Sequence, residues 1–437
     1  MSPDVLVLGA GAAGLSAAID LAGAGLRVEI IEARDRVGGR MFTVVDPVLK
    51  HPVELGAEFV HGLAPEIWQL IQEHNLKVTE VDGDLWCSLD DKLQECNFFA
   101  QADKILSSMD DRAPDETFLN FLARRFPGDS HKDAKRWATG YVSGFNAADP
   151  GLVSVHWLVH SRAADEQIEG DRAFRIAGGY EKIVDIFFHE LKHLNVPIHL
   201  STVAESIQWK RGSVEIRATV GKDKTVLSAP RALITLPLGV LQAPESVRFE
   251  PKLPAEKQSA LKRLAMGKVV RVTLCFRERF WERLRGMPDS KSLADVSFLF
   301  SRDDLFPTWW TKMPEPLPMI TGWAPARSAE TLAGLSKDAI TGKAVESLSR
   351  ILQIDQSQVQ SQLNTTYFHD WDSDPFSRGA YSYVKAGGEG CQRSVAAPLD
   401  GTLFFAGEAT DSSGHNGTVH GAIASGRRAA AEMIEGR

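Results

Sequence analysis

Cysteine is scarce in this sequence, with four residues among 437, and their spacing matches no metal-binding motif. They are Cys87, Cys96, Cys275 and Cys391. We therefore expect no metal site built on thiolates. Isolated thiols are typical of a reducing compartment, so we expect four free cysteines and a cytoplasmic protein.

Long apolar runs and an excess of basic residues are also missing. No run approaches the roughly 20 apolar residues of a membrane-spanning helix, so we expect no membrane anchor. The first apolar segment, residues 5–8, is short and belongs to a folded unit, so no secretory signal is expected. The net charge is −8, and no basic stripe is present to follow nucleic-acid phosphates. A nucleic-acid partner is therefore not expected.

The length and composition of the chain predict a two-domain soluble enzyme. With 437 residues, 43% of them hydrophobic, the chain can bury more than one core. Acidic residues are frequent between residues 66 and 111, and Asp82 and Asp103 are among them. A solvated helical cap is the favoured interpretation of this region. The alternative is an acidic mouth that concentrates polycations.

The most informative pattern lies in the first forty residues. Residues 5–8 and 28–31 predict two buried strands, and an Ala- and Leu-rich helix runs between them. The turn before the helix reads Gly-Ala-Gly-Ala-Ala-Gly, which in this context is a dinucleotide-binding fingerprint. Its glycines permit a tight turn, a close approach of pyrophosphate to the helix N-terminus, and close packing of helix on strand. The predicted contacts are Gly9, Gly11, Ala13, Gly14 and, for the ribose hydroxyls, Glu32.

The residues that follow narrow the dinucleotide to FAD. An Arg-x-Gly-Gly-Arg pattern at residues 36–40 suits a second approach to phosphate. This extension resembles the fingerprint of the flavin-containing amine oxidases. The resemblance implies an α/β fold in which a Rossmann-type FAD-binding domain is interleaved with an α+β substrate-binding domain. It also implies FAD contacts at Arg34, Gly38, Gly39 and Arg40.

The segment 54–62 carries the first indication of a substrate site. It resembles the Glu-Leu-Gly-Ala-x-x-x-His-Gly stretch of animal polyamine oxidases, in which the histidine lines the substrate site. A lone histidine is more often a packing residue, but the resemblance implies a substrate contact for His61. It also implies that Gly56, Ala57 and Glu58 lie against the flavin.

Arg271 marks a departure from the family. Counting back from Phe280-Trp281, the family has a lysine at this position, and that lysine holds a water against flavin N5. Arginine keeps the positive charge but is larger and planar, so it is expected to take the place of the water. Lys268 is a poor substitute, because residues three apart on a strand face opposite sides.

The C-terminal quarter carries the strongest resemblance to polyamine oxidases and lysine-specific histone demethylases. There the resemblance implies that Trp371 packs beside the flavin and that Tyr381 walls the amine site. Monoamine oxidases hold FAD through a cysteine where this chain has Ala380, so non-covalent FAD is expected. Thr418 replaces a second aromatic residue of the monoamine oxidases. The remaining implied cofactor contacts are Val203, Gly407, Glu408, Thr418, Val419 and Ala422.

These patterns predict FAD-dependent oxidation of an amine, with a polyamine-type substrate favoured, hydride transfer to flavin, and oxygen as the acceptor that yields hydrogen peroxide. The absence of a long helical insertion favours the oxidases over the demethylases. Two alternatives stay open: an FAD-dependent oxidase or desaturase of a lipophilic non-amine substrate, and a flavin-binding protein without turnover. The predicted FAD-binding domain comprises residues 1–75, 173–242 and 379–437, and the substrate-binding domain comprises residues 76–172 and 243–378.

Overall fold

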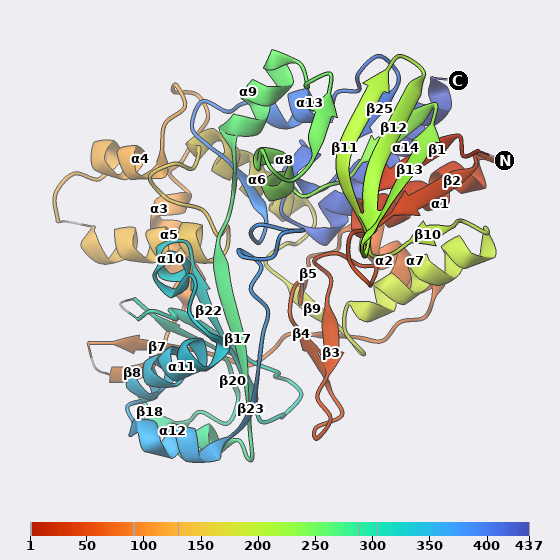
Figure 1. Ribbon diagram of the computed structural model, residues 1–437. Coiled ribbons are helices and arrows are strands. Elements are labelled where there is room, and N and C mark those ends of the chain that lie inside the picture. Colours follow the sequence, from red (N-terminus) through yellow and green to blue (C-terminus); the bar gives the residue numbers. More distant parts are fainter. Residues whose placement is uncertain (1, 91, 130, 288, 303, 437) are drawn as a thin grey trace.

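The computed structural model describes residues 2–90, 92–129, 131–287, 289–302 and 304–436. It contains a five-stranded parallel sheet (Figure 1). The strand order is β10 (Ile198–His199), β2 (Val28–Ile31), β1 (Val5–Leu8), β14 (Arg231–Ile234) and β25 (Leu403–Phe405). The predicted Rossmann-type unit is confirmed, and its strands come from three separated parts of the chain.

Helices bury both ends of the chain against this sheet. Helix α1 (Ala12–Gly23) packs on α14 (Val419–Glu435), so the red and blue ends of the chain lie side by side in Figure 1. Helix α7 (Glu181–His193) also packs on α1. The small residues Ala17, Ala18 and Gly426 allow the close approach of the two long helices, because a Cβ on Gly426 would lie 2.3 Å from the Ala13 carbonyl oxygen.

A second sheet has seven strands. Its order is β23 (Leu363–Phe368), β17 (Val269–Phe276), β22 (Met319–Pro325), β21 (Thr308–Thr311), β20 (Val296–Ser301), β7 (Asp84–Leu89) and β8 (Lys92–Glu95). Val270, Val272 and Leu274 share a core with helix α11 (Lys337–Leu352). Because side chains alternate along a strand, Arg271 faces the opposite side, toward the first sheet.

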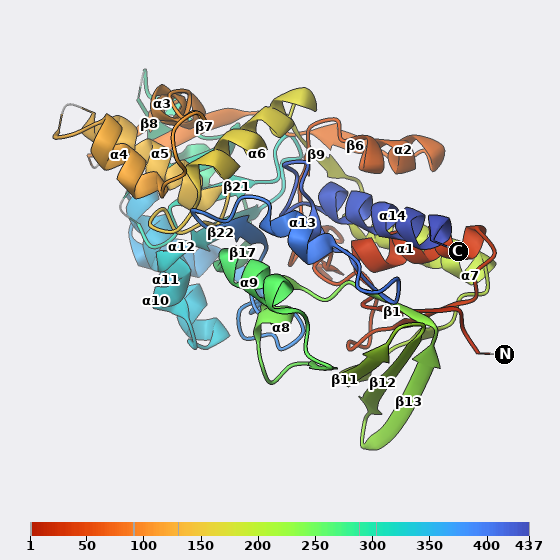
Figure 2. The ribbon, with the colours of Figure 1, turned by 90° about the horizontal axis from the view of Figure 1, so that it is seen from above.

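The remaining elements surround these two sheets. Four helices lie together on one side of the seven-stranded sheet: α3 (Phe98–Leu106), α4 (Phe118–Arg125), α5 (Lys132–Gly144) and α6 (Val155–Gln167). A four-stranded sheet extends away from the rest of the molecule (Figure 2). Its order is β13 (Asp223–Ala229), β12 (Ser213–Val220), β11 (Thr202–Lys210) and β15 (Arg248–Glu250). The domain boundaries given above stay a prediction.

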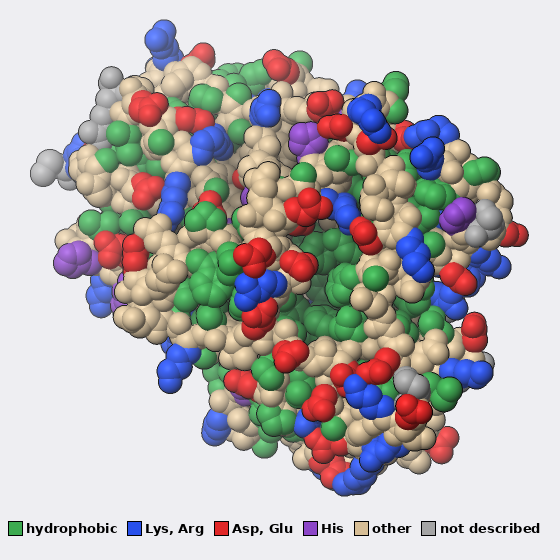
Figure 3. Space-filling model, turned by 180° about the vertical axis from the view of Figure 1, so that it is seen from behind, with side chains coloured by type: hydrophobic (Ala, Val, Ile, Leu, Met, Phe, Trp, Pro, Cys, Tyr) green, Lys and Arg blue, Asp and Glu red, His purple; other side chains and the backbone are tan. Residues whose placement is uncertain are grey.

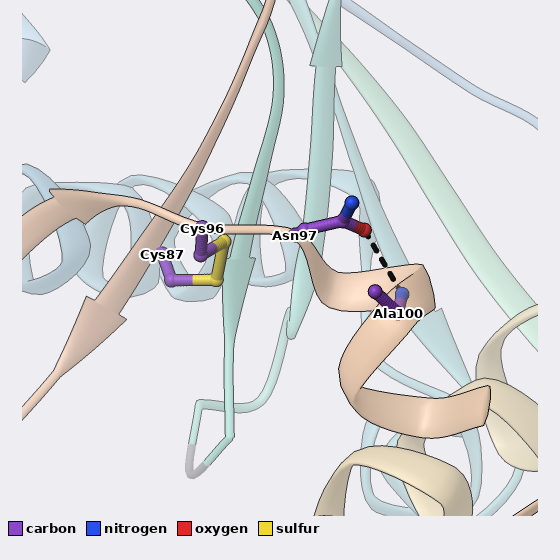
Figure 4. Close-up of a disulfide and its surroundings, with 4 residues drawn as sticks. All are labelled: Cys87, Cys96, Asn97 and Ala100. Carbon is purple, nitrogen blue, oxygen red and sulfur yellow. Dashed lines mark hydrogen bonds between the residues drawn. A yellow bond between two sulfur atoms is a disulfide. The ribbon is translucent and has the colours of Figure 1, made fainter. Parts of the chain in front are cut away.

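Two of the four cysteines form a disulfide, so the expectation of four free thiols is wrong. Cys87 in β7 and Cys96 just after β8 are nine residues apart, and the β7–β8 hairpin brings their Cα atoms to 5.7 Å (Figure 4). That separation suits a disulfide. Asn97 follows directly and caps α3 by accepting a hydrogen bond from the Ala100 backbone N–H. Cys275 and Cys391 are free and buried.

Within the described parts of the chain, no helix has both the length and the apolar character needed to cross a membrane.

Candidate active site

A cavity of about 1470 Å³ runs between the two large sheets. On one face of the molecule Figure 3 shows a hollow with hydrophobic side chains in its floor and charged side chains around its rim. The cavity is lined by twenty-one of the predicted site residues: Gly9, Gly11, Ala13, Glu32, Arg34, Gly38, Gly39, Arg40, Gly56, Ala57, Glu58, His61, Val203, Arg271, Trp371, Tyr381, Gly407, Glu408, Thr418, Val419 and Ala422. Gly14 does not line it.

The glycine-rich turn leaves backbone open to the cavity. A Cβ on Gly11 would meet no atom within 4 Å, so this backbone borders free space. Gly9 has φ = 107°, which favours glycine, and a Cβ on Gly14 would lie 1.9 Å from the Gly9 carbonyl oxygen. Gly14 therefore serves helix–strand packing, as its place in the fingerprint predicts. Gly11 caps α1, whose first N–H groups suit an anion.

Glu32 is placed at the end of β2 with its carboxylate held by the backbone. Its Oε2 accepts a hydrogen bond from the Ala10 N–H at 2.7 Å, and its Oε1 accepts one from the Arg34 N–H at 2.9 Å. Burial raises the pKa of Glu32. Each oxygen keeps a further acceptor position on the cavity, which fits the ribose hydroxyls of a dinucleotide. Together with the open backbone at Gly11, these residues fit FAD.

Two arginines connect this N-terminal unit to the C-terminal part of the chain. The Arg34 guanidinium pairs with Asp374 at 2.6 Å. Arg40 donates to the Ala380 carbonyl oxygen at 2.7 Å and pairs with Glu408 at 2.9 Å. The second carboxylate oxygen of Glu408 accepts hydrogen bonds from Ser382 and from the Gly417 N–H. Arg40 and Glu408 thus position the segments that close the cavity.

A flat wall lies between the two halves of the cavity. The Trp371 indole N–H donates to the Leu55 carbonyl oxygen at 2.7 Å, which fixes the ring beside Gly56. A Cβ on Gly56 would lie 1.8 Å from the Arg40 carbonyl oxygen, so only glycine fits there. Val203, Gly407, Val419 and Ala422 complete this wall with backbone and small apolar side chains.

Glu58 is engaged by four donors. It is a buried residue, and its Oε1 binds Lys312 at 2.9 Å and Arg175 at 2.8 Å. Its Oε2 binds Arg271 and the Trp310 indole N–H, the latter at 3.0 Å. Burial alone would raise the pKa of Glu58, but Lys312, Arg271 and Arg175 hold it well below its usual range.

This cluster changes the interpretation of two predicted site residues. The Glu58 carboxylate binds three cations, Lys312, Arg175 and Arg271. Arg271 also donates to the Gly56 carbonyl oxygen at 2.7 Å. The Arg271 guanidinium is therefore fixed in the wall of the cavity by Glu58 and by the Gly56 backbone. Lys268, in contrast, lies outside the cavity lining, near Glu330 and Asp372. Sequence reasoning missed Lys312 and Arg175; a lysine directly after the aromatic strand β21 was the available signal.

The other half of the cavity is walled by aromatic side chains. The His61 ring lies 5.9 Å from the Phe59 ring and 5.3 Å from the Phe145 ring, measured between centroids. Burial lowers the pKa of His61 to about 4, so this imidazole is neutral at pH 7. The Tyr381 hydroxyl donates to the Phe145 carbonyl oxygen at 2.8 Å.

Thr418 has a capping role. Its Oγ1 accepts a hydrogen bond from the Gly421 N–H at 2.9 Å and donates to the His415 carbonyl oxygen at 2.6 Å. This fixes the first turn of α14 at the cavity wall, where the helix N-terminus favours negative charge.

The chain matches the family model for flavin containing amine oxidoreductases over residues 12–102 and 98–434. It is 28% identical to polyamine oxidase 4 of Oryza sativa subsp. japonica, over 98% of this chain and 88% of that protein. It is 27% identical to lysine-specific histone demethylase 1 homolog 2 of Arabidopsis thaliana, over 98% of this chain and 58% of that protein.

Solved structures show the same fold. A putrescine oxidase bound to putrescine superposes with a TM-score of 0.82 at 20% identity, covering 100% of this chain and 99% of that chain. A cyclohexylamine oxidase from Brevibacterium oxydans IH-35A gives a TM-score of 0.80 at 20% identity, again over 100% and 99% of the two chains.

Proposed function

Because the chain belongs to the family of flavin containing amine oxidoreductases, we propose that it oxidises amines with non-covalently bound FAD, that a polyamine-type substrate is favoured, and that oxygen is reduced to hydrogen peroxide. One observation carries this proposal: a single cavity joins a dinucleotide cradle to an aromatic pocket that contains a neutral histidine. The similarity to polyamine oxidases and to a putrescine oxidase supports the substrate class.

The residues of the aromatic pocket favour the neutral, reactive form of the amine. FAD, when bound, accepts a hydride from the carbon next to the amine nitrogen, and oxygen reoxidises it. The nitrogen must first lose its proton, because its lone pair drives hydride loss. An apolar pocket disfavours the ammonium form, and neutral His61 accepts a hydrogen bond from the nitrogen. Tyr381, fixed through Phe145, limits the positions that the amine can take.

Non-covalent binding of FAD is supported by the residues around the cavity. Ala380 offers no sulfur, and among the described residues neither free cysteine lines the cavity. Acid precipitation of the holoprotein should release all yellow colour into the supernatant. Colour that stays in the pellet would contradict this part of the proposal.

The function is tested by mixing holoprotein anaerobically with mono-, di- and polyamines and following flavin absorbance, then admitting oxygen and measuring peroxide. We expect bleaching by amines and peroxide in equal amount to the amine consumed. Bleaching only by lipophilic non-amine substrates would favour the desaturase-type alternative. No bleaching by any compound would favour a flavin-binding protein without turnover.

The cytoplasmic location expected above stays a prediction, and the Cys87–Cys96 disulfide weighs against it because disulfides are rare in reducing compartments. Thiol titration of protein freshly isolated from its native cells, with and without reductant, tests this point. Four titratable thiols before reduction would restore the expectation.

A further inference from the structure

One face of helix α6 forms a wall of the cavity. Trp157, Ser161 and Asp165 are spaced four residues apart, so they lie on the same face, and all three line the cavity. The Trp157 indole N–H donates to the Asn416 side-chain oxygen at 2.7 Å, close to the start of α14. Asp165 lies eight residues further along, about 12 Å at 1.5 Å per residue. Along this face the helix thus leads from Asn416, just before Thr418, to a carboxylate.

The carboxylate of Asp165 has no strong partner within the part of the chain that the structure describes. Arg162, one turn earlier on α6, pairs instead with Asp103 of α3 at 2.7 Å. The nearest imidazole nitrogen, His415 Nδ1, lies 4.0 Å from Asp165 Oδ1, which is too long for a hydrogen bond. This nitrogen is itself buried without a hydrogen-bond partner. The Asp165 carboxylate, which lines the cavity, is therefore open to a donor from a ligand.

Burial also changes the protonation equilibrium of the Asp165 carboxyl group. It raises the pKa of Asp165 to about 7, and Arg162 only partly opposes the rise. A cationic ligand would offset the cost of keeping the carboxylate charged in this place. Glu58 cannot serve in the same way, because four donors of the protein already engage it.

We propose that Asp165 binds a second, positively charged nitrogen of the substrate while the reacting nitrogen lies at the His61 end of the cavity. The inference rests on the proposed amine oxidation and deepens it, since it assigns the preference for amines with two or more cationic nitrogens to one residue. An ammonium group brings three N–H donors and no acceptor, which matches a carboxylate without a strong partner in the protein. Glu166, the next residue of α6, also lines the cavity and adds a second negative charge that attracts such a substrate.

The test compares two substrates of equal length, 1,8-diaminooctane and octylamine, in the wild type and in Asp165→Asn. We expect the variant to lose at least ten-fold in kcat/KM for the diamine, mainly through KM, with less than a two-fold change for the monoamine. Glu190→Gln removes the same charge from an exposed residue of α7 that does not line the cavity, and it serves as the matched control. Equal losses for both substrates, or no loss for the diamine, would overturn the proposal.

A binding measurement separates this proposal from the proposed function. Octane-1,8-diguanidine and octylguanidine stay charged and resist oxidation, so their affinity for the holoprotein can be measured by calorimetry. The diguanidine should bind the wild type at least ten-fold more tightly than the monoguanidine at pH 8, and Asp165→Asn should abolish that difference. Charge-dependent binding without amine turnover would contradict the proposed function alone. Amine turnover without any preference for the dication would contradict the role of Asp165 alone.

The same binding difference should depend on pH. Below about pH 7 Asp165 becomes protonated, so the preference for the diguanidine should fall at pH 6 in the wild type and stay absent at both pH values in Asp165→Asn. The groups that face Asp165 are Arg162 on its own helix, Asp103 on α3, Tyr141 on α5 and His415 before α14. A preference that is the same at pH 6 and pH 8 would contradict Asp165 as its source.

Discussion

Two carboxylates, Glu58 and Asp165, line one cavity and behave in opposite ways. Glu58 has a pKa held well below its usual range, whereas the pKa of Asp165 rises to about 7. Burial pushes both values upward. The difference comes from partners: Glu58 has Lys312, Arg175 and Arg271 around it, while the guanidinium nearest to Asp165 is engaged elsewhere.

The comparison shows that burial alone does not tell whether a charged residue supports the fold or waits for a ligand. A buried carboxylate surrounded by protein donors belongs to the scaffold, and removing it leaves cations without a counter-charge. A buried carboxylate without such donors costs the fold free energy, and a ligand can recover that cost. Neutral variants of Glu58 and Asp165 should therefore change the free energy of unfolding in opposite directions.

The largest effect on stability is expected at Glu58. Glu58→Gln would leave Lys312, Arg175 and Arg271 buried without their common anion, and we expect a loss of about 3–5 kcal/mol in the free energy of unfolding. Urea unfolding of the holoprotein at pH 7 measures it. Arg271→Met is the control, because Glu58 then keeps two cations and the loss should be smaller. Because the pKa of Glu58 is lowered in the folded state, its stabilising contribution to the free energy of unfolding should be complete above its ordinary pKa of 4.5. That contribution should decline in more acidic solution. A variant as stable as the wild type would break the comparison.

The next effect is expected at Asp165, with the opposite sign. Its folded-state pKa of about 7 lies above the ordinary value of 3.8, so its charged form opposes folding. Relative to the wild type, Asp165→Asn should gain stability between about pH 4 and pH 7 and keep a constant advantage above that range. The shift corresponds to at most about 4 kcal/mol, and water in the cavity reduces the expected gain to about 1–3 kcal/mol. Unfolding curves at pH 5 and pH 8 would decide, and a pH-independent difference would count against the assignment.

The smallest effect is expected at His61, which carries no charge at neutral pH. His61→Ala should slow flavin reduction by amine about ten-fold, or about 1.4 kcal/mol, through a lost contact with the substrate. Because its pKa is lowered to about 4, the variant and the wild type should show parallel pH profiles between pH 6 and pH 9. Stopped-flow absorbance measures the reduction step directly. An unchanged rate with an unchanged flavin spectrum would show that His61 is only a packing residue.

The features that the sequence predicts well are local or belong to the backbone. The turn from Gly9 to Gly14 and the acid at Glu32 act within one strand–helix–strand unit, so a short pattern identifies them. The Rossmann-type fold was predictable for the same reason. Arg271 was placed by its distance from Phe280-Trp281 in the family pattern, and strand alternation set Lys268 aside; of the two, only Arg271 lines the cavity.

The features that sequence reasoning missed depend on contacts between distant parts of the chain. Glu58 and Arg271 are 213 positions apart, and neither residue reveals the other. The Cys87–Cys96 disulfide follows from the register of one hairpin, which thiol spacing alone does not define. Asp165 looks like any acidic residue near the end of a helix until the Arg162–Asp103 pair shows that its neighbouring cation is occupied.

The order of strands in the five-stranded sheet has a consequence for biosynthesis. Its first two strands end by residue 31, but its edge strand begins at Leu403 and the capping helix follows at Val419. Strands β1 and β2 pair with each other, and their outer partners β14 and β10 are complete by residue 234, but β14 waits for β25. At about 5–20 residues per second, the ribosome needs several more seconds to tens of seconds to reach β25 and α14. During that time the nascent chain has no complete nucleotide site, so the cofactor is expected to bind only once the C-terminal segment has been made.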